Sequence, residues 1–371
     1  MTNWKLAVIG AGKIGRTIAN LLHAGGTYHV SVFDQNKTAL DSLPEFIECH
    51  HVDIQDGERL ENALRGHNAV ISAAPFYLTE TIAQSAFNAG VHYFDLTEDV
   101  ASTAFVEKLA RGGKTAFAPQ CGLAPGFVSI AASALAKQFD SLESLVLRVG
   151  ALPRFPTNRL KYNLTWSTDG LINEYCNPCI AIDHGSLRHV APLEGYESFS
   201  LEGADYEAFN TSGGLGSLAN SLSGKVQNLR YLSIRYPGHR DVMRLLLHDL
   251  GLERRRDLLK QVMEEAIPAT IQDRVLVFIT ARGEIDGRFE ERSYLNNINA
   301  RKINGEAWSA IQITTAAGIC ACVDLMRTGD LPQSGFIHQE DICFEQFLQN
   351  RYGALYTPDT SDIAQFNQLA A

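Results

Sequence analysis

The sequence lacks an excess of positive charge. It has 32 lysine and arginine residues against 42 aspartate and glutamate residues, a formal net charge of −10. Proteins that bind nucleic acid carry a basic footprint, so we predict no nucleic-acid partner. No uninterrupted apolar run approaches the ~20 residues of a membrane span. Nothing near the N-terminus resembles a signal peptide, and we therefore expect a cytoplasmic protein with no membrane partner.

Cysteine is also scarce, with seven residues among 371. Cys176 and Cys179 have C-x-x-C spacing, but no second pair completes a zinc site, so we predict no metal. Thiols in the cytoplasm are normally reduced, which excludes a disulfide framework. The apolar content of 45% and charged content of 20% are ordinary for a globular protein, and the length suffices for two domains.

What the sequence does contain is a glycine-rich turn near its start. Residues 6–15 read LAVIGAGKIG, where an apolar strand leads into Gly10, Gly12 and Gly15 in G-x-G-x-x-G spacing. The three glycines would allow a tight turn, close approach of the backbone to a pyrophosphate, and close packing of helix on strand. Because a helical pattern and a second strand follow, the motif predicts a dinucleotide held at a helix N-terminus.

Asp34 predicts which dinucleotide is bound. It ends the second apolar strand, residues 29–33, where a carboxylate can bind the adenosine ribose hydroxyls. A carboxylate at this position repels a 2′-phosphate, so we predict NAD as the cofactor. Lys37 would offset part of that repulsion, and NADP remains the alternative.

The pattern of strands and helices divides the chain. Strands and helices alternate through the first ~120 residues, which predicts a Rossmann-type, doubly wound parallel sheet. After residue 142 strands follow one another with few helices, which predicts a second, α+β domain with a mostly antiparallel sheet. The predicted parts are residues 1–125 for the dinucleotide-binding domain, 126–308 for the substrate-binding and dimerisation domain, 309–356 for a segment that rejoins the first domain, and 357–371 for a mobile tail.

Loops at the carboxyl ends of the parallel strands are expected to line the nicotinamide, because ligands bind at that edge of such sheets. The predicted cofactor-binding residues are Gly10, Gly12, Lys13, Ile14, Gly15, Asp34, Asp53, Ile54, Ala73, Ala74, Pro75, Phe76, Gly122 and Leu123.

Five further sequence motifs narrow the prediction of the protein family. They are GLAPG at 122–126, VGALP at 149–153, LKYNLTWSTDGLINEY at 160–175, EAFNTSGG at 207–214 and IRYPGH at 234–239. Together with the glycine turn they make the chain resemble the saccharopine dehydrogenase family, most closely its short branch, which contains lysine 6-dehydrogenases. The resemblance implies a Rossmann domain completed by a helix near the C-terminus, and an α+β domain for substrate binding and dimer contacts. It therefore implies a homodimer.

The resemblance also implies an NAD(P)-dependent amine dehydrogenase that acts on a C–N bond in lysine metabolism. The substrate would be saccharopine, giving glutamate and allysine, or lysine, giving allysine and ammonia. Two alternatives stay open: a dehydrogenase of carboxy-polyamines or other amino-acid C–N adducts, and a non-catalytic dinucleotide-binding regulator. A regulator should lack polar groups near the nicotinamide, so the presence of Asp95, Arg235 and His239 favours an enzyme.

Amine oxidation needs groups that move protons. Asp95 ends a predicted strand at the carboxyl edge of the sheet and could take a proton from the amine or activate water. His239 is the second candidate, because a histidine titrates near neutral pH. The alternatives are that the neighbouring carboxylates Glu98 and Asp99 favour the N-terminus of the next helix, and that His239 caps a helix.

An amino-acid substrate also needs partners for its carboxylate and its aliphatic chain. Arg235 at a strand end could bind the carboxylate in a fork, and Thr211, Ser212 and Gly213 offer hydroxyls and open backbone to an anion or ammonium group. We predict a strand at residues 163–167, with Tyr162 and Trp166 on one face as an apolar wall. The alternative for Trp166 is a place in the core.

Overall fold

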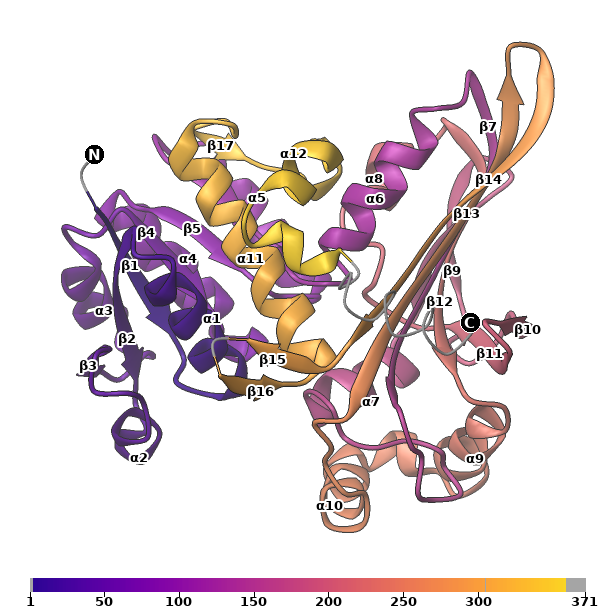
Figure 1. Cartoon of the computed structure of the whole chain (residues 1–371), viewed down its shortest axis with the longest axis horizontal. Helices are drawn as coiled ribbons and strands as arrows, with labels where there is room; N and C mark the ends of the chain where they lie inside the picture. Colours follow the sequence, from indigo (N-terminus) through magenta and orange to yellow (C-terminus); the bar gives the residue numbers. More distant parts are fainter. Residues whose placement is uncertain (1–2, 304, 358–371) are drawn as a thin grey trace, which may run out of the picture. The chain divides into compact units, whose positions relative to one another are not determined.

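The computed structural model describes residues 3–303 and 305–357, which form two compact units (Figure 1). Among the described residues, the first unit takes in residues 3–134, 213–221 and 312–353. The second takes in residues 135–212, 222–303, 305–311 and 354–357. The sequence did not predict that residues 213–221 join the first unit. The predicted tail, residues 357–371, lies outside the described residues from residue 358 on.

The first unit contains the predicted parallel sheet, which has seven strands. β1 pairs with β2 on one side and with β4 on the other, which creates the switch point of a doubly wound sheet. The register pairs Ile9 with Ser72 and Ser72 with Asp95, so these strands end together. In sheet order the strands are β17 (Gly335–Phe336), β6 (Ala116–Ala118), β5 (His92–Asp95), β4 (Ala69–Ser72), β1 (Trp4–Ile9), β2 (Tyr28–Asp34) and β3 (Glu48–His51).

Helices connect these strands. α3 packs beside α4, and α4 packs beside α5. α11 lies beside α1, because the Gln312 amide donates to the Thr17 hydroxyl at 3.1 Å. The helices are α1 (Lys13–Ala24), α2 (Lys37–Asp41), α3 (Gly57–Leu64), the 3₁₀ turn η1 (Phe76–Leu78), α4 (Thr79–Ala89), α5 (Val100–Ala110), α6 (Phe127–Ala136), α8 (Leu218–Leu222), α11 (Ala310–Thr328), the 3₁₀ turn η4 (Gln339–Asp341) and α12 (Phe344–Gln349). The 3₁₀ turn η5 (Gly353–Tyr356) follows, and its last three residues belong to the second unit.

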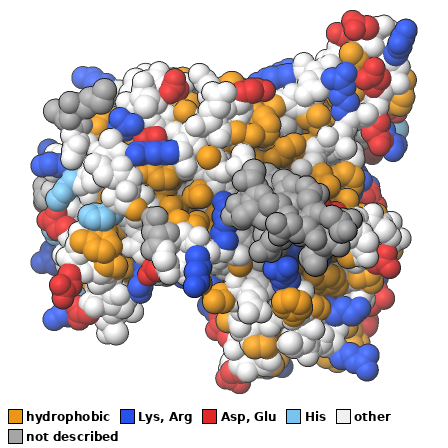
Figure 2. All heavy atoms as spheres, in the orientation of Figure 1, with side chains coloured by type: hydrophobic (Ala, Val, Ile, Leu, Met, Phe, Trp, Pro, Cys, Tyr) orange, Lys and Arg blue, Asp and Glu red, His pale blue; other side chains and the backbone are white. Residues whose placement is uncertain are grey.

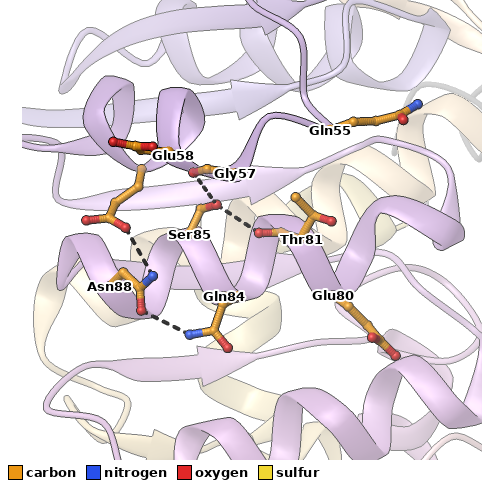
Figure 3. Close-up of a pocket in the computed structure, with 9 residues that line it drawn as sticks. Gln55, Gly57, Glu58, Glu80, Thr81, Gln84, Ser85 and Asn88 are labelled. Atoms are coloured by element: carbon orange, nitrogen blue, oxygen red, sulfur yellow. Dashed lines mark hydrogen bonds between the residues drawn. The ribbon is translucent and has the colours of Figure 1, made fainter.

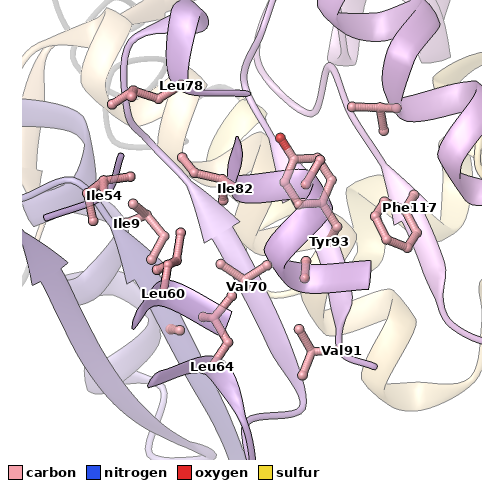
Figure 4. Close-up of a cluster of buried hydrophobic side chains, with 14 of the residues drawn as sticks. Ile9, Ile54, Leu60, Leu64, Val70, Leu78, Ile82, Val91, Tyr93 and Phe117 are labelled. Atoms are coloured by element: carbon pink, nitrogen blue, oxygen red, sulfur yellow. The ribbon is translucent and has the colours of Figure 1, made fainter. Parts of the chain in front are cut away.

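The core of the first unit lies between the sheet and the helices α3 and α4 (Figure 4). Strand residues Val70, Tyr93 and Phe117 pack in one cluster with Leu60 of α3 and Ile82 of α4, and all five are fully buried. Strands covered on both faces lack an alternating pattern, which is why these strands appear in the sequence as continuous apolar runs.

Helix α11 is long and apolar enough to cross a membrane by length and composition alone. However, 83% of its most apolar 18-residue window is buried inside the protein. A core helix that is apolar on several faces has this composition. α11 is the one such helix in the part of the chain that the structure describes, and because it is mostly buried it is weak evidence for a membrane span.

The second unit is built on an eight-stranded mixed sheet that is mostly antiparallel, as predicted. β12 and β7 form its one parallel pair among the described strands, and β8 pairs with β12 and β9 beside the main path. The path is β10 (Glu197–Leu201), β11 (Ala204–Asn210), β12 (Val226–Arg235), β7 (Ser141–Pro153), β13 (Asp273–Ile285) and β14 (Arg288–Asn299), with β8 (Cys179–Asp183) and β9 (Ser186–Val190) outside it and β15 (Arg301–Ile303) and β16 (Glu306–Trp308) as a separate hairpin.

Helices of the second unit are short. They are α7 (Thr168–Cys176), α9 (His239–Arg244), the π-helical turn η2 (Leu245–Asp249), the 3₁₀ turn η3 (Leu252–Arg254) and α10 (Arg256–Ala266).

The predictions of two strands in this unit differ from the structure. Residues 163–167 form no strand, although Leu164 makes a single bridge to Ala269. Helix α7 begins directly afterwards, because the Ser167 hydroxyl accepts the Gly170 N–H at 3.2 Å and caps it. The second is residues 201–211, which the sequence pattern also predicts as one strand. Residues 204–210 do form a strand, β11, but residue 201 ends β10, the other strand of the same hairpin. Glu202 and Gly203 both have positive φ, which suits a two-residue turn.

Charged side chains of both signs are interspersed over the face drawn in Figure 2, without a large field of one sign. Some large apolar side chains are exposed as well. Phe289 and Leu295 of β14 keep 63% and 41% of their surface accessible. Strand β14 is also one end of the main sheet path.

Candidate functional site

The glycine turn between β1 and α1 has the geometry that the motif predicts. Gly10 has a φ of +107°, and a Cβ there would lie 2.9 Å from the Ala73 carbonyl oxygen. A Cβ on Gly15 would lie 1.9 Å from the Gly10 carbonyl oxygen. Gly12 caps helix α1, and no atom lies within 4 Å of the position its Cβ would take. The turn is therefore closed on the strand side and open where a phosphate would approach the helix N-terminus.

Asp34 fits the ribose role. Its Oδ2 accepts the Ala11 N–H at 2.6 Å and its Oδ1 accepts the Asn36 N–H at 2.7 Å. These two bonds hold the carboxylate beside the glycine turn. Because each carboxylate oxygen can accept two hydrogen bonds, one position on each remains for a ribose hydroxyl. The residues present thus fit a dinucleotide.

The other predicted cofactor residues lie around the same edge of the sheet. Lys13 and Ile14 form the first turn of α1, and Ala73 and Ala74 approach Gly10 after β4. Pro75 precedes the exposed Phe76. After β3, the Asp53 carboxylate accepts the Gln55 N–H at 3.0 Å, and Ile54 is buried in the core cluster of this unit. The remaining two are Gly122 and Leu123, in the loop before α6.

Asp95, at the end of β5, is 1% exposed and has three hydrogen-bond donors. Its Oδ1 accepts the N–H groups of Gln120 at 2.8 Å and Thr97 at 3.0 Å, and its Oδ2 accepts the Tyr93 hydroxyl at 2.8 Å. Burial raises the pKa of Asp95 to about 6, although these three bonds favour the charged form. The carboxyl group therefore changes protonation close to neutral pH, and it also fastens the loop that carries Gly122.

That loop is shaped by residues that the sequence analysis missed. Gln120 is buried with a φ of 65°, and its side-chain carbonyl accepts the Ser217 N–H at 3.3 Å. The buried Glu340 accepts the Ser217 hydroxyl at 2.8 Å and the Ser221 hydroxyl. Gln120 and Glu340 thus hold residues 213–221 in the first unit. A non-glycine residue with positive φ leaves no signal in a single sequence.

The predicted Thr211-Ser212-Gly213 motif is divided between the units. In the first unit, the Cβ position of Gly213 lies 3.3 Å from Glu98. In the second unit, the Thr211 hydroxyl bonds the Ser233 hydroxyl at 2.8 Å, and the Ser212 hydroxyl donates to the Pro178 carbonyl at 3.0 Å. Both hydroxyls therefore already have protein partners.

Arg235, Tyr175 and His239 of the second unit form a buried hydrogen-bonded chain. Arg235 Nε donates to the Tyr175 hydroxyl at 2.7 Å, and that hydroxyl lies 3.0 Å from His239 Nε2. His239 Nδ1 donates to the Leu160 carbonyl at 2.9 Å. Because a carbonyl only accepts, Nδ1 carries the proton of the neutral ring and Nε2 accepts from Tyr175.

His239 is fully buried, and burial together with the nearby Arg235 lowers its pKa to about 3. The imidazole is therefore neutral at neutral pH, and both of its nitrogens have partners. This geometry suits a residue that orients Tyr175. The predicted acid–base role for His239 would require that at least one of these hydrogen bonds be exchanged for a bond to the substrate.

Aromatic rings surround Arg235. Its guanidinium carbon lies 5.3 Å from the ring centre of Tyr162 and 5.6 Å from that of Tyr175. The Trp166 indole donates to the Tyr162 hydroxyl at 3.2 Å, so these two residues lie together although they are not on a strand. Trp166 is half-buried and packs on an apolar cluster. Burial opposes the charge of Arg235, but Tyr175, Tyr162 and Glu174 hold its pKa above the ordinary value.

The IRYPGH loop between β12 and α9 is positioned by a glutamate that the sequence analysis did not single out. Buried Glu207 of β11 accepts the Gly238 N–H at 2.8 Å and the Arg240 N–H at 2.7 Å. These are N–H groups at the start of α9, where a carboxylate is favourable. Glu207 therefore fixes the helix that begins with His239.

A depression of about 500 Å³ lies between helices α3 and α4 (Figure 3). It is lined by polar side chains that bond one another: Asn88 donates to Glu61 at 3.0 Å, and Ser85 donates to the Gly57 carbonyl at 3.1 Å. No predicted site residue lines it. Its nearest approach in sequence is Gln55, which lines it and donates its N–H to the predicted cofactor residue Asp53 at 3.0 Å.

Two family models match the chain, one after the other along the sequence. The saccharopine dehydrogenase NADP binding domain matches residues 6–123, and the saccharopine dehydrogenase C-terminal domain matches residues 122–352. Fold and glycine turn define a dinucleotide-binding oxidoreductase, and its cofactor is NAD(P). The chain belongs to the saccharopine dehydrogenase family.

The chain is similar to several solved structures. Saccharopine dehydrogenase (L-Glu forming) from Saccharomyces cerevisiae is 15% identical, with a TM-score of 0.77, over 94% of this chain and 98% of that one. A DAP dehydrogenase of C. glutamicum is 12% identical, with a TM-score of 0.48, over 98% and 99% of the two chains. At such identity the yeast enzyme shows a common fold.

Proposed function

We propose that this protein oxidises the C–N bond of a lysine-derived amine with NAD(P) as the hydride acceptor. The substrate is saccharopine, giving glutamate and allysine, or lysine, giving allysine and ammonia. The observation that carries the proposal is that both saccharopine dehydrogenase models match, in order, from residue 6 to residue 352. The buried, charged Arg235 supports it, because an amino-acid substrate carries a carboxylate that needs a cation.

Bound NAD(P) would supply the acceptor for a hydride from the carbon next to nitrogen. Gly10, Gly12 and the start of α1 would hold its pyrophosphate, and Asp34 would hold its ribose. The loops at residues 73–76 and 122–123 would line the nicotinamide. The preference for NAD over NADP follows from the negative charge of Asp34.

The amine must be neutral before hydride can leave, and the resulting imine must react with water. Asp95 is the candidate for these proton transfers, because its pKa of about 6 lies near working pH. Arg235 would hold the substrate carboxylate. Tyr162 and Trp166 would contact the aliphatic chain.

The test is steady-state formation of NADH and NADPH with L-lysine, with L-saccharopine and with carboxy-polyamines. We expect turnover with lysine or saccharopine, and a rate that increases toward alkaline pH in the oxidation direction. Turnover with carboxy-polyamines alone would assign a different substrate class. If no amine supports turnover although NAD binds, the protein is better explained as a dinucleotide-binding regulator.

A further inference from the structure

Arg235 has donors that the protein does not use. A guanidinium has five N–H groups. Three of them bond to described residues: Nε to the Tyr175 hydroxyl at 2.7 Å, Nη1 to the Ile234 carbonyl at 2.8 Å and Nη2 to a Glu174 oxygen at 3.5 Å. Within the described part of the chain, two N–H groups of this buried cation are thus left for another acceptor.

The Glu174 carboxylate has even fewer hydrogen-bond partners than Arg235. It lies on α7 and is 9% exposed, and its contact with Arg235 at 3.5 Å is the polar contact of its carboxylate among the described residues. Charge-assisted bonds between a nitrogen cation and a carboxylate are usually near 2.7–2.9 Å. Burial raises the pKa of Glu174, and Arg235 only partly opposes this. A buried carboxylate with one long contact is costly, so its capacity to accept hydrogen bonds points to a ligand.

The backbone fixes this pair in place. The Glu174 carbonyl accepts the Ser212 N–H at 3.0 Å, which ties α7 to the end of β11. The Arg235 guanidinium lies between two tyrosine rings and cannot turn freely. The Glu174 side chain keeps 11% of its surface exposed against 4% for Arg235, so the carboxylate is the less deeply buried member of the pair.

We propose that Glu174 and Arg235 together bind the α-amino-acid head group of the substrate. Glu174 accepts hydrogen bonds from the α-ammonium group, and the two unused N–H groups of Arg235 donate to the α-carboxylate. A zwitterion suits this pair, because it brings one charge for each and adds no net charge to a buried site. A simple carboxylate would be repelled by Glu174, and a simple amine by Arg235. This inference rests on the proposed function for the amino-acid nature of the substrate.

The experiment compares three ligands that differ in one charged group: L-lysine, 6-aminohexanoate, which lacks the α-ammonium group, and cadaverine, which lacks the α-carboxylate. L-saccharopine is included because it carries the same head group. Dissociation constants are measured by calorimetry on the NAD-loaded full-length protein. The variant is Glu174→Gln, which keeps the shape and removes the charge. The control is Glu197→Gln, in the same unit, whose carboxylate is already bonded by Arg148 at 2.8 Å and Arg230 at 3.0 Å.

Glu174→Gln should weaken binding of L-lysine or L-saccharopine by about 10- to 100-fold, the usual cost of a lost bond between charged groups. It should not weaken binding of 6-aminohexanoate and should strengthen it where Glu174 repels the lone carboxylate, and Glu197→Gln should leave the dissociation constants of all ligands unchanged. Arg235→Lys should reduce the preference for L-lysine over cadaverine. The proposal is overturned if Glu174→Gln weakens 6-aminohexanoate as much as L-lysine, or weakens neither.

Failure of the function and failure of the head-group site give different results. If an α-amino acid binds in a manner that depends on Glu174 but no amine is oxidised, the head-group site stands and the proposed function falls. If lysine or saccharopine is oxidised by Glu174→Gln with unchanged KM, the function stands and the head-group site falls. Absence of binding by every α-amino acid tested overturns the head-group site as well.

Discussion

Single residues of the same type lie in opposite environments in this protein. Asp34 is partly exposed and bonds two backbone N–H groups beside the glycine turn, whereas Asp95 is buried with donors on both oxygens. The first environment holds the carboxylate beside the glycine turn, where we expect it to bind the ribose of the cofactor. The second shifts the pKa of the carboxyl group toward neutral pH.

We predict that NAD binds more tightly than NADP, because Asp34 repels the 2′-phosphate. Asp34→Ala should narrow or invert this preference. Titration of protein fluorescence with both cofactors measures it, and Asp41→Ala, which removes an exposed carboxylate on α2, serves as the control. Tighter binding of NADP by the unmodified protein would show that Asp34 does not select the cofactor.

A second prediction separates proton transfer by Asp95 from its fastening of the loop. Asp95→Asn keeps an oxygen for the Gln120 and Thr97 N–H groups but cannot take up a proton. If Asp95 moves protons, this variant should bind cofactor normally and lose on the order of 10²–10⁴-fold in kcat. Tyr93→Phe, which removes one hydrogen bond and keeps the carboxyl group, should lose less than about tenfold. Full kcat in Asp95→Asn would leave Asp95 with the fastening role alone.

The third prediction concerns the neutral His239. Its pKa of about 3 in the folded protein lies below the ordinary value of 6.5, so on acidification the unfolded chain gains a proton that the folded protein does not. The contribution to stability is present above pH ~6.5 and is lost as the pH falls toward ~3, by about 2 kcal/mol between about pH 7 and pH 5. The measurement is urea unfolding at pH 7 and at pH 5, and His239→Gln should not show this loss of unfolding free energy between them. His184→Gln, at an exposed position, should show the same loss as the unmodified protein. An equal acid loss in His239→Gln would contradict the assignment.

At the scale of elements, distant segments complete the first unit. β17 adds to the parallel sheet by pairing Gly335 and Phe336 with β6, and α11 lies beside α1. A sheet edge without β17 and an α1 face without α11 would expose apolar surface. Both segments come after residue 309 in the sequence.

We therefore predict that a chain ending at Gly305 is insoluble or loses cofactor affinity. A chain ending at residue 356 removes only the predicted tail, residues 357–371, and should bind NAD unchanged, which makes it the matched control. Solubility and NAD titration are the measurements. Normal folding and cofactor binding by the chain that ends at Gly305 would show that residues 309–356 do not belong to the dinucleotide-binding domain.

At the scale of the whole molecule, we predict a homodimer formed through the second domain. Strand β14 has 12 residues, ends the main sheet path and exposes Phe289 and Leu295. Long exposed edges of sheets are usually covered, and a second copy is one such cover. Sedimentation at micromolar concentration should give twice the 40.8 kDa of one chain. Leu295→Lys should raise the monomer fraction, whereas lysine at the exposed Val262 of α10 should not. A monomeric mass for the unmodified protein would refute the prediction.

Sequence alone determined the features that depend on local patterns. The spacing of Gly10, Gly12 and Gly15 before a helix required a dinucleotide turn, and the structure shows why, since side chains at Gly10 and Gly15 would collide with backbone. The alternation of strands and helices determined the parallel sheet, because hydrophobic periodicity is a property of residues that are close in sequence. The five motifs determined the family, because their order is specific.

Only the tertiary structure decided which distant residues meet. Residues 213–221 join the first unit through Gln120 and Glu340, and Glu174 meets Arg235 across 61 positions of sequence. The neutral state of His239 was decided in the same way, since burial and a neighbouring guanidinium set its pKa. A single sequence carries the types of these residues but not the distances between them, and charge, burial and hydrogen bonding all depend on those distances.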